Sequence, residues 1–389
     1  MTTHVFIVDA ITFKVHLEYL FAGTGAKENH VDFNNGPNTR HRAVTENMLT
    51  SMIADASRIR RGDQIIFYLQ QNFSHGIREG KFYGIFTAKH DWSFLDDYDG
   101  QQYLFDSLQK SLTFRTLIEP STVYQQGVTE WEALDEIRNI ACPHQMLWSL
   151  IYRKLKGNRG NTMITLYESE RLCQLIRNKN HRTTLGSSDG NSLSFDQGTQ
   201  TIIVIERAQQ EYGGRQEPIN ILPRLINKYE NGLSFEAHLQ AYICKNIGSD
   251  INISLNNSLL QSNSNIEWIG NEVSCGVGMQ RIDIMLALIV NGQRQIMPIE
   301  LKAVEASEDN VRQIKRYVDW IEQYYIPNRH SDILPVLVAK RTANRGRSQY
   351  RNVLRAIDDF NKDYAQRCCN LRYVEYHLEN NNLKFEIIQ

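Results

Sequence analysis

The sequence predicts a mixed α/β protein of two domains, and three observations support this fold class. Short apolar strands alternate with amphipathic helices in both halves of the chain, which favours sheets covered by helices. The strands of the second half are almost continuously apolar, which is typical of a buried sheet. The chain has 389 residues, of which 41% are hydrophobic, so it can fill two or three ordinary cores.

The N-terminal half is predicted to form a small α/β unit with a curved or barrel-like sheet. An amphipathic helix is expected at residues 46–59, and a second helix at residues 143–155 with Pro143 in its first turn. Apolar runs bounded by turn residues predict four strands, at residues 5–10, 64–70, 80–89 and 111–120.

The main linker is predicted at residues 180–200. This stretch is rich in Ser, Gly, Asn and Asp and poor in apolar residues, so we do not expect it to pack into a core. A second weak point is expected at residues 211–218, with a strand-like run between the two. The predicted organisation is therefore a domain at 1–180, a linker region at 181–220 and a second domain at 221–389.

The C-terminal half follows the order α-β-β-α-β, which predicts a buried mixed sheet flanked by helices. Residues 340–351 are expected to be a basic loop, and a two-stranded hairpin turned at Asn380 to Asn382 is expected to end the chain. One face of the second helix is apolar through Val311, Ile314, Val318, Ile321 and Tyr325. The core elements are expected at residues 233–247, 281–290, 293–303, 309–325 and 333–339.

The pair Asn291–Gly292 predicts the geometry of the central hairpin. Asn-Gly between two apolar runs is typical of a two-residue turn with both residues at positive φ. That turn places Asp283 directly opposite Glu300, and Lys302 then lies on the same face of the sheet. Pro298 removes one ladder hydrogen bond, and a bulge there would shift this register by one residue.

Two opposed carboxylates at the end of a buried hairpin predict a centre that binds a cation. Like charges facing each other destabilise a sheet, and buried unpaired carboxylates are costly. A divalent cation would offset both effects, and oxygen-only ligands favour Mg²⁺, with Mn²⁺ as a substitute. The alternative is a buried salt bridge of Lys302 with Asp283 or Glu300 that carries out no chemistry.

The order of Asp283 and then Glu300–Lys302 resembles the D…(D/E)xK signature of the PD-(D/E)xK nuclease superfamily. Glu236 lies on the preceding helix, where many members place another acid. Gln313 and Tyr317 match the QxxxY motif of the RecB-like branch, and the whole stretch is similar to the catalytic domain of NucS/EndoMS-type endonucleases. The resemblance implies a restriction-endonuclease-like αβββαβ core.

The resemblance also implies a role for each motif residue. Asp283 and Glu300 would ligate the metal, together with the backbone carbonyl of Leu301, and Glu236 would bind it directly or through water. Lys302 would activate the nucleophile. The expected reaction is metal-assisted hydrolysis of a phosphodiester bond.

The helix residues of the motif have alternatives of their own. Gln313 and Tyr317 would position the centre or contact a phosphate, and their i, i+4 spacing puts them on one side of a helix. They are otherwise the polar flank of an amphipathic helix. Glu236 is otherwise a solvated acid at a helix N-terminus.

Two strands of the N-terminal half, in residues 61–68 and 80–89, resemble the EVE/YTH branch of the PUA-like fold. That resemblance implies a domain that holds a flipped base in an aromatic pocket. The alternative for each aromatic residue is ordinary core packing. The candidate base-binding residues are Tyr68, Tyr83, Trp92, Phe94, Trp131 and, for a base edge, Asp9.

Phosphate contacts must come from local basic patches, because 43 basic and 44 acidic residues give a net charge of −1. The second patch follows the last core strand and has no acid near it in sequence, so we expect it to contact phosphate unless it is simply a solvated loop. The two patches are Arg58, Arg60 and Arg61, and then Lys340, Arg341, Arg345, Arg347 and Arg351.

These features together predict a Mg²⁺-dependent endonuclease that acts on double-stranded DNA. A restriction enzyme fits best, with an N-terminal domain that recognises a specific base, modified or not. The alternatives are a repair nuclease for mismatched or branched DNA, as the NucS similarity indicates, and a non-enzymatic protein that binds modified nucleic acid. Cutting both strands with one centre per chain predicts a homodimer.

Other functions and locations are not expected. The chain has no GxxxxGK[ST] phosphate loop, so no ATPase activity is expected. It has no signal peptide and no apolar run of membrane-spanning length, which predicts no membrane association and a cytoplasmic protein. The six cysteines form no CxxC pair and are expected to be reduced thiols.

Overall fold

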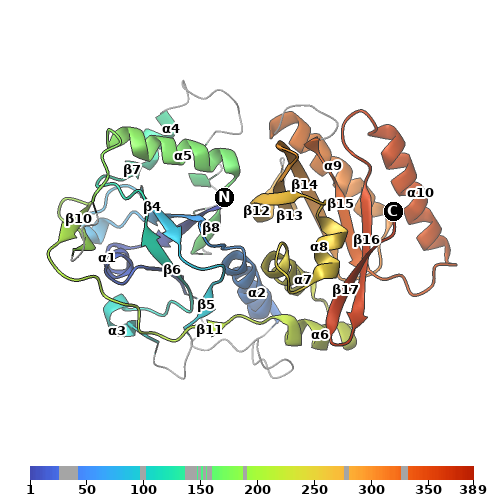
Figure 1. The fold of residues 1–389 in the computed structure, drawn as a ribbon, viewed down its shortest axis with the longest axis horizontal. Helices are drawn as coiled ribbons and strands as arrows, with labels where there is room; N and C mark the ends of the chain where they lie inside the picture. Colours follow the sequence, from blue (N-terminus) through green and yellow to red (C-terminus); the bar gives the residue numbers. More distant parts are fainter. Residues whose placement is uncertain are drawn as a thin grey trace. The chain divides into compact units, whose positions relative to one another are not determined.

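The chain folds into two compact units, each of which mixes helices and strands, so the predicted α/β class is confirmed (Figure 1). The division is Met1–Asp32 with Asp55–Ile219, and Phe33–Ala54 with Asn220–Gln389. No helix in the described part of the chain is long and apolar enough to cross a bilayer. The computed structural model describes residues 1–25, 43–96, 102–135, 147, 150–151, 155, 160–186, 191–275, 280–325 and 332–389.

The first unit is built on a curled, half-barrel sheet. Its strands are β1 (Thr3–Val8), β2 (Phe21–Thr24), β3 (Gln64–Leu69), β4 (Lys81–Ala88), β5 (Phe94–Leu95), β6 (Phe114–Pro120), β7 (Val128–Thr129), β8 (Asn161–Met163) and β11 (Glu217–Pro218). They follow the order β11-β5-β6-β4-β3-β1-β8, with β2 on β6 and β7 on β4. The four strands predicted in this half correspond to β1, β3, β4 and β6, so they are confirmed.

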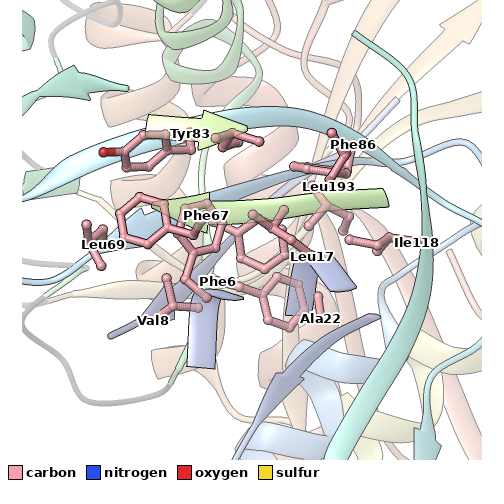
Figure 2. Packing of buried hydrophobic residues seen from close by; sticks show 14 of the residues in the cluster. Phe6, Val8, Leu17, Ala22, Phe67, Leu69, Tyr83, Phe86, Ile118 and Leu193 are labelled. Carbon is pink, nitrogen blue, oxygen red and sulfur yellow. The ribbon is translucent and has the colours of Figure 1, made fainter. Parts of the chain in front are cut away.

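Strand β3 has an apolar cluster on each face, which explains its continuously apolar sequence. Phe67 packs into one cluster, and its neighbours Ile66 and Tyr68 pack into the other. Figure 2 shows the first cluster, in which Phe67 lies among side chains from several elements, including Tyr83 and Leu193.

Helices cover this sheet, and one of them begins at a capping box. Asp9 accepts a hydrogen bond from the Thr12 N–H and so starts the first helix, which the sequence analysis missed. Most of the helix predicted at residues 143–155 lies outside the described residues. The helices of this unit are α1 (Ala10–Tyr19), α3 (Phe105–Leu108), α4 (Glu130–Asp135) and α5 (Leu166–Lys179), with the short 3-10 turn η2 (Phe73–His75).

The prediction that residues 180–200 cannot pack into a core is wrong. Strands β9 (Ser192–Asp196) and β10 (Thr201–Ile205) pair as an antiparallel hairpin. Leu193 and Phe195 are buried in the cluster of Figure 2, together with Ile202. The compositional argument failed because side chains alternate between the two faces of a strand, so Leu193 and Phe195 are enough to reach the cluster, while the small polar residues Ser192 and Ser194 are buried on the other face.

The second unit is built on a mixed sheet. Its elements are α2 (Ala43–Ser57), of which the first part belongs here, α6 (Leu222–Glu230), α7 (Glu236–Asn246), α8 (Ile253–Leu259), β12 (Ser264–Ser274), β13 (Arg281–Val290), β14 (Gln293–Lys302), α9 (Glu308–Tyr324), β15 (Val336–Lys340), α10 (Ser348–Asp363), β16 (Arg372–Glu379) and β17 (Asn382–Ile387). The strand order follows the sequence from β12 to β17. Strand β15 is parallel to β14 and β16, and the other neighbours are antiparallel.

The predicted order α-β-β-α-β is present as α7, β13, β14, α9 and β15, and the structure adds α8 and β12 between α7 and β13 (Figure 1). The apolar face predicted for α9 is confirmed, since all five of its residues are buried. The C-terminal hairpin is also confirmed, with Asn380 and Asn381 at positive φ. The basic loop is shorter than predicted, because α10 begins at Ser348.

Candidate active centre

The turn at Asn291–Gly292 sets the geometry of the β13–β14 hairpin as the sequence predicts. The φ angles of the two residues are 50° and 77°. The ladder runs without a shift from Val290 opposite Gln293 to Ile284 opposite Ile299, and Pro298 pairs with Met285 inside it. The proline therefore introduces no bulge, and the next pair outward is Asp283 and Glu300.

Asp283 holds the open end of this hairpin together. Its Oδ2 accepts a hydrogen bond from the Leu301 N–H at 2.8 Å. This side-chain contact takes the place of a ladder bond beyond the last paired residues. On α7, Gln240 donates from Nε2 to the Asp283 backbone carbonyl at 2.7 Å, which fixes the same residue from a second side.

Lys302 lies between two carboxylates. Its Nζ is 2.5 Å from Glu300 Oε1 and 3.6 Å from Glu236 Oε1. The Glu300 side chain is completely buried, whereas that of Glu236, the first residue of α7, is 42% exposed. The lysine therefore links a buried acid to an acid that reaches solvent.

Tyr317 and Gln313 of α9 complete the group. The Tyr317 hydroxyl is 2.6 Å from Glu300 Oε2 and 2.9 Å from the Arg281 carbonyl, either of which can accept its proton. Gln313 Nε2 donates to the same hydroxyl at 2.6 Å. Tyr317 is 1% exposed, so these two residues are not an ordinary polar flank of the helix.

The charges at this centre are not balanced. Burial and the neighbouring Glu300 carboxylate raise the pKa of Asp283 well above its usual range. Burial also raises the pKa of Glu300, and Lys302 does not fully offset this rise. Burial lowers the pKa of Lys302, but the Glu300 carboxylate outweighs it and the net pKa is raised, so the lysine stays protonated.

This donor set fits a divalent cation in its chemistry. The half-buried Asp283 and the buried Glu300 both have raised pKa values, and the Lys302 ammonium group pairs with Glu300 and Glu236, so additional positive charge would stabilise both carboxylates in the ionised form. Within the described residues, no group of three or more His, Cys, Asp and Glu side chains is gathered as a metal site. Glu236 is connected to Glu300 through Lys302, which pairs with both acids. Leu301 takes part through its backbone N–H, which donates to Asp283.

The second basic patch borders this centre. In the parallel ladder Lys302 pairs with Ala339, one residue before the patch begins. Arg341 and Arg347 are exposed there. Lys340 lies over the Tyr229 ring, with Nζ 3.9 Å from the ring centroid.

The expectation that no acid lies near this patch is wrong for one of its residues. Arg345 Nη2 is 2.8 Å from Glu375 Oε2, and Glu375 comes from β16, which is distant in sequence. The Ala343 N–H donates to Glu305 as well. Arg345 therefore connects the loop to β16 through an ion pair and is not a free cation.

In the first basic patch, one prediction is contradicted. Arg58 is completely buried beside Asp55, with 3.6 Å between Nη2 and Oδ1, so it cannot contact a phosphate. Arg60 is half-buried and donates to the Ser57 carbonyl at 2.6 Å. Only Arg61 of this patch has an exposed side chain.

Most of the candidate base-binding aromatics pack inside the first unit. Tyr83 and Phe94 are 0% and 1% exposed. Tyr83 donates to the Gln200 carbonyl at 2.7 Å, and a methyl group at Gly127 would fall 2.6 Å from its ring. Tyr68 is 7% exposed and donates to Glu130. These three residues belong to the core, which was the alternative expected for each candidate aromatic residue.

The two candidate tryptophans are accessible. Trp92 is 41% exposed and stacks on His90, with ring centroids 5.3 Å apart. Trp131, on α4, is 58% exposed. Asp9 is committed to capping α1 and to an ion pair with Lys110, which lowers its pKa even though burial raises it.

Sequence reasoning missed Gln240, although its spacing gave a signal. It lies four residues after Glu236, and residues at i and i+4 share one side of a helix. It also missed Glu46, whose partners on α6 and α7 are about 180 to 190 positions away in the chain.

Comparisons with known proteins leave the family open. No family model matches the chain, and no curated protein matches it. It is similar to a solved structure described as a hypothetical protein from Leishmania major, with 11% identity and a TM-score of 0.26, over 46% of this chain and 96% of that one. Rpa0253 from Rhodopseudomonas palustris is similar at 14% identity, with a TM-score of 0.24, over 45% and 93%. TM-scores this low support no assignment.

Proposed function

We propose that this protein is a Mg²⁺-dependent nuclease that hydrolyses DNA phosphodiester bonds. The observation that carries the proposal is the pairing of the half-buried Asp283 with the fully buried Glu300, two carboxylates with raised pKa values, beside a protonated lysine. A purely structural salt bridge would need one acid and one base. The second acid is what favours a metal centre.

The residues of the chain divide the work of the reaction. Asp283 and Glu300 would hold the cation, which supplies charge neutralisation at the phosphate and a more acidic bound water. Lys302 is protonated, so it acts as a hydrogen-bond donor that positions phosphate or water and not as a general base. Tyr317, held by Gln313, keeps the Glu300 carboxylate in place.

The fold of the second unit supports a restriction-endonuclease-like core. The order α7, α8, β12, β13, β14, α9 and β15 contains the αβββαβ pattern with one additional helix, α8, and β14 and β15 are parallel. The exposed Arg341 and Arg347 follow β15 and are the candidates for contact with the DNA backbone. We further propose a homodimer that cuts both strands in the cytoplasm.

For the first unit we propose a PUA-like domain that recognises a base, as in a restriction enzyme. Its curled sheet supports this proposal. Of the aromatic residues considered, Trp92 and Trp131 are exposed enough to stack on a base. This role would direct the metal centre to particular sites.

The test is cleavage by the full chain with Mg²⁺ on unmodified plasmid, cytosine-modified phage DNA and mismatched duplexes, each with and without chelator. Glu300→Gln is the matched control, because it keeps the shape of the side chain and removes its charge. Site-dependent cleavage of plasmid or phage DNA that Glu300→Gln abolishes supports a restriction enzyme.

The other outcomes separate the alternatives. Cleavage confined to mismatched duplexes would assign the repair role. DNA binding without any metal-dependent cleavage would overturn the nuclease proposal and leave a binding protein.

A further inference from the structure

Helix α2 supplies a buried carboxylate to the second unit from far along the chain. Glu46 is 2% exposed. Arg224 donates to both of its oxygens, with 2.8 Å from Nε to Oε1 and 3.0 Å from Nη2 to Oε2. His238 Nε2 lies 2.8 Å from Oε1, and Lys228 Nζ lies 3.4 Å from it. The carboxylate thus joins α2 to α6 and α7.

Helix α7 also carries two side chains of the candidate active centre. Glu236 pairs with Lys302, and Gln240 donates to the Asp283 carbonyl. In a helix, residues four apart share a side, whereas residues two apart do not face each other. His238 therefore leaves the helix on a different side from Glu236 and Gln240, so α7 is held on one side by the centre and on another by Glu46.

We propose that Glu46 is a positioning residue of the active centre. By holding His238 it fixes the rotation of α7 about its axis, and that rotation decides where Glu236 and Gln240 meet the end of the β13–β14 hairpin. The catalytic unit is then discontinuous in sequence. Its C-terminal part, Asn220–Gln389, lacks this anchor when it is expressed alone. The catalytic part of this proposal rests on the proposed nuclease function.

A simpler role for Glu46 is to neutralise the buried cations around it. The variants Glu46→Ala and Glu46→Ala/Arg224→Gln separate the two roles, because alanine has no oxygen that could still accept a hydrogen bond from His238. The double variant removes one cation along with the anion, so it restores much of the charge balance without restoring the anchor for His238. If neutralisation is the whole role, it recovers both stability and α7 order. If positioning is the role, it recovers stability alone.

The experiment uses the full chain and follows two readouts. Backbone amide exchange over α7 is measured by mass spectrometry in metal-free protein, and single-turnover cleavage is measured at saturating Mg²⁺. We expect both Glu46 variants to speed α7 exchange by roughly tenfold or more, with α10 unchanged, and to slow cleavage by about 10- to 100-fold with DNA affinity retained. Asn47→Ala, an exposed position on the same helix, should change neither readout.

The outcomes are distinguishable from those of the nuclease test. Unchanged α7 exchange in Glu46→Ala, or full recovery of exchange and cleavage in the double variant, would overturn the positioning role. A wild-type protein that cleaves nothing would overturn the nuclease proposal, and the exchange comparison would still test Glu46. If Glu46→Ala does not fold, the double variant provides the test.

Discussion

The second unit contains two acidic sites that differ in how well nearby cations neutralise them. One site is Glu46, and the other is the pair of Asp283 and Glu300. Burial raises the pKa of Glu46, but hydrogen bonds from His238 and Arg224 outweigh it and the net pKa is lowered. At Asp283 and Glu300 burial prevails, because one lysine, Lys302, faces three acids, Asp283, Glu300 and Glu236, and both pKa values are raised. Glu46 has two cationic partners, Arg224 and Lys228. Asp283 and Glu300 have too little positive charge near them to hold both in the ionised form.

This difference separates a structural site from a candidate reactive one. A buried acid that is fully paired stabilises the fold in its ionised form and needs no further ligand. A buried acid pair with too little positive charge favours the binding of a cation or a proton. The predictions that follow test this contrast, beginning with the largest expected effect.

Removing the Glu46 carboxylate should cost the most stability. Glu46→Ala leaves the buried Lys228 and the half-buried Arg224 without their acid, and breaking a buried ion pair from one side costs about 3–5 kcal/mol. Urea unfolding of the full chain measures this loss, followed by fluorescence. If Glu46→Ala lowered the free energy of unfolding no more than Asn47→Ala does, the ion pairs of Glu46 would contribute little to stability. Glu46 would then not differ from Asp283 and Glu300 in the way proposed.

The substitution Asp283→Asn should have the opposite effect on stability and abolish most activity. Without metal, losing one of two facing acids should stabilise the fold by about 1 kcal/mol, because like charges opposed in a sheet repel. Cleavage should fall by roughly 10²–10³-fold, since an electrostatic partner of the reaction is lost. Chemical unfolding with chelator and a cleavage assay measure the two effects. A destabilised Asp283→Asn would indicate a balanced structural site.

The pH dependence of metal-free stability should differ between the two groups. The raised pKa values of Asp283 and Glu300 give a contribution that is present below their ordinary values of 3.8 and 4.5 and is lost as pH rises through the folded values. The lowered pKa of Glu46 gives a contribution that is present above its ordinary 4.5 and is lost as pH falls.

Unfolding curves between pH 3 and 8, roughly the range in which these carboxyl groups titrate, test this difference. Glu300→Gln should flatten the decline of stability at rising pH, and Mg²⁺ should reverse that decline in the wild type. A wild-type curve that matches Glu300→Gln throughout, with no Mg²⁺ effect, would contradict the proposed imbalance.

The substitution Tyr317→Phe should have a smaller effect on cleavage. It removes the hydroxyl that contacts Glu300 Oε2 and leaves the ring packed. One hydrogen bond to a charged group contributes about 1.5–3 kcal/mol, so cleavage should slow by roughly 10- to 150-fold. The cleavage rate of Tyr317→Phe at several Mg²⁺ concentrations measures this loss. Gln313→Ala should follow in the same direction, and a change in Tyr317→Phe alone would place Gln313 outside the site.

The smallest change in stability is expected at the exposed tryptophans of the first unit. Trp131→Ala should shift unfolding by about 0.5 kcal/mol or less, because surface substitutions usually stay within this range. It should nevertheless reduce discrimination between modified and unmodified DNA in a binding assay. Tyr83→Ala is the contrasting buried position, where a cost of about 3–5 kcal/mol is expected. Unchanged discrimination in Trp131→Ala and Trp92→Ala would exclude these residues from base recognition.

Local patterns in the sequence determined the class of fold and the heart of the candidate centre. The Asn291–Gly292 turn fixed the register from Val290 outward, because a two-residue hairpin leaves no freedom in pairing. That register places Asp283 next to Glu300 at the end of the hairpin, and Gln240 of α7 and Tyr317 of α9 then hold the two residues. The buried face of α9 was predicted in the same way, from the spacing of its apolar residues along the sequence.

Only the tertiary structure decided what depends on contacts between distant segments. It buried Tyr83 under the β9–β10 hairpin, which composition alone had placed in a linker. It paired Arg345 with Glu375 and buried Arg58, so neither acts as a free surface cation. It brought Glu46 to His238, which lies 192 positions further along the 389-residue chain. Sequence spacing carries no information about such encounters, because burial and pairing are properties of the packed chain.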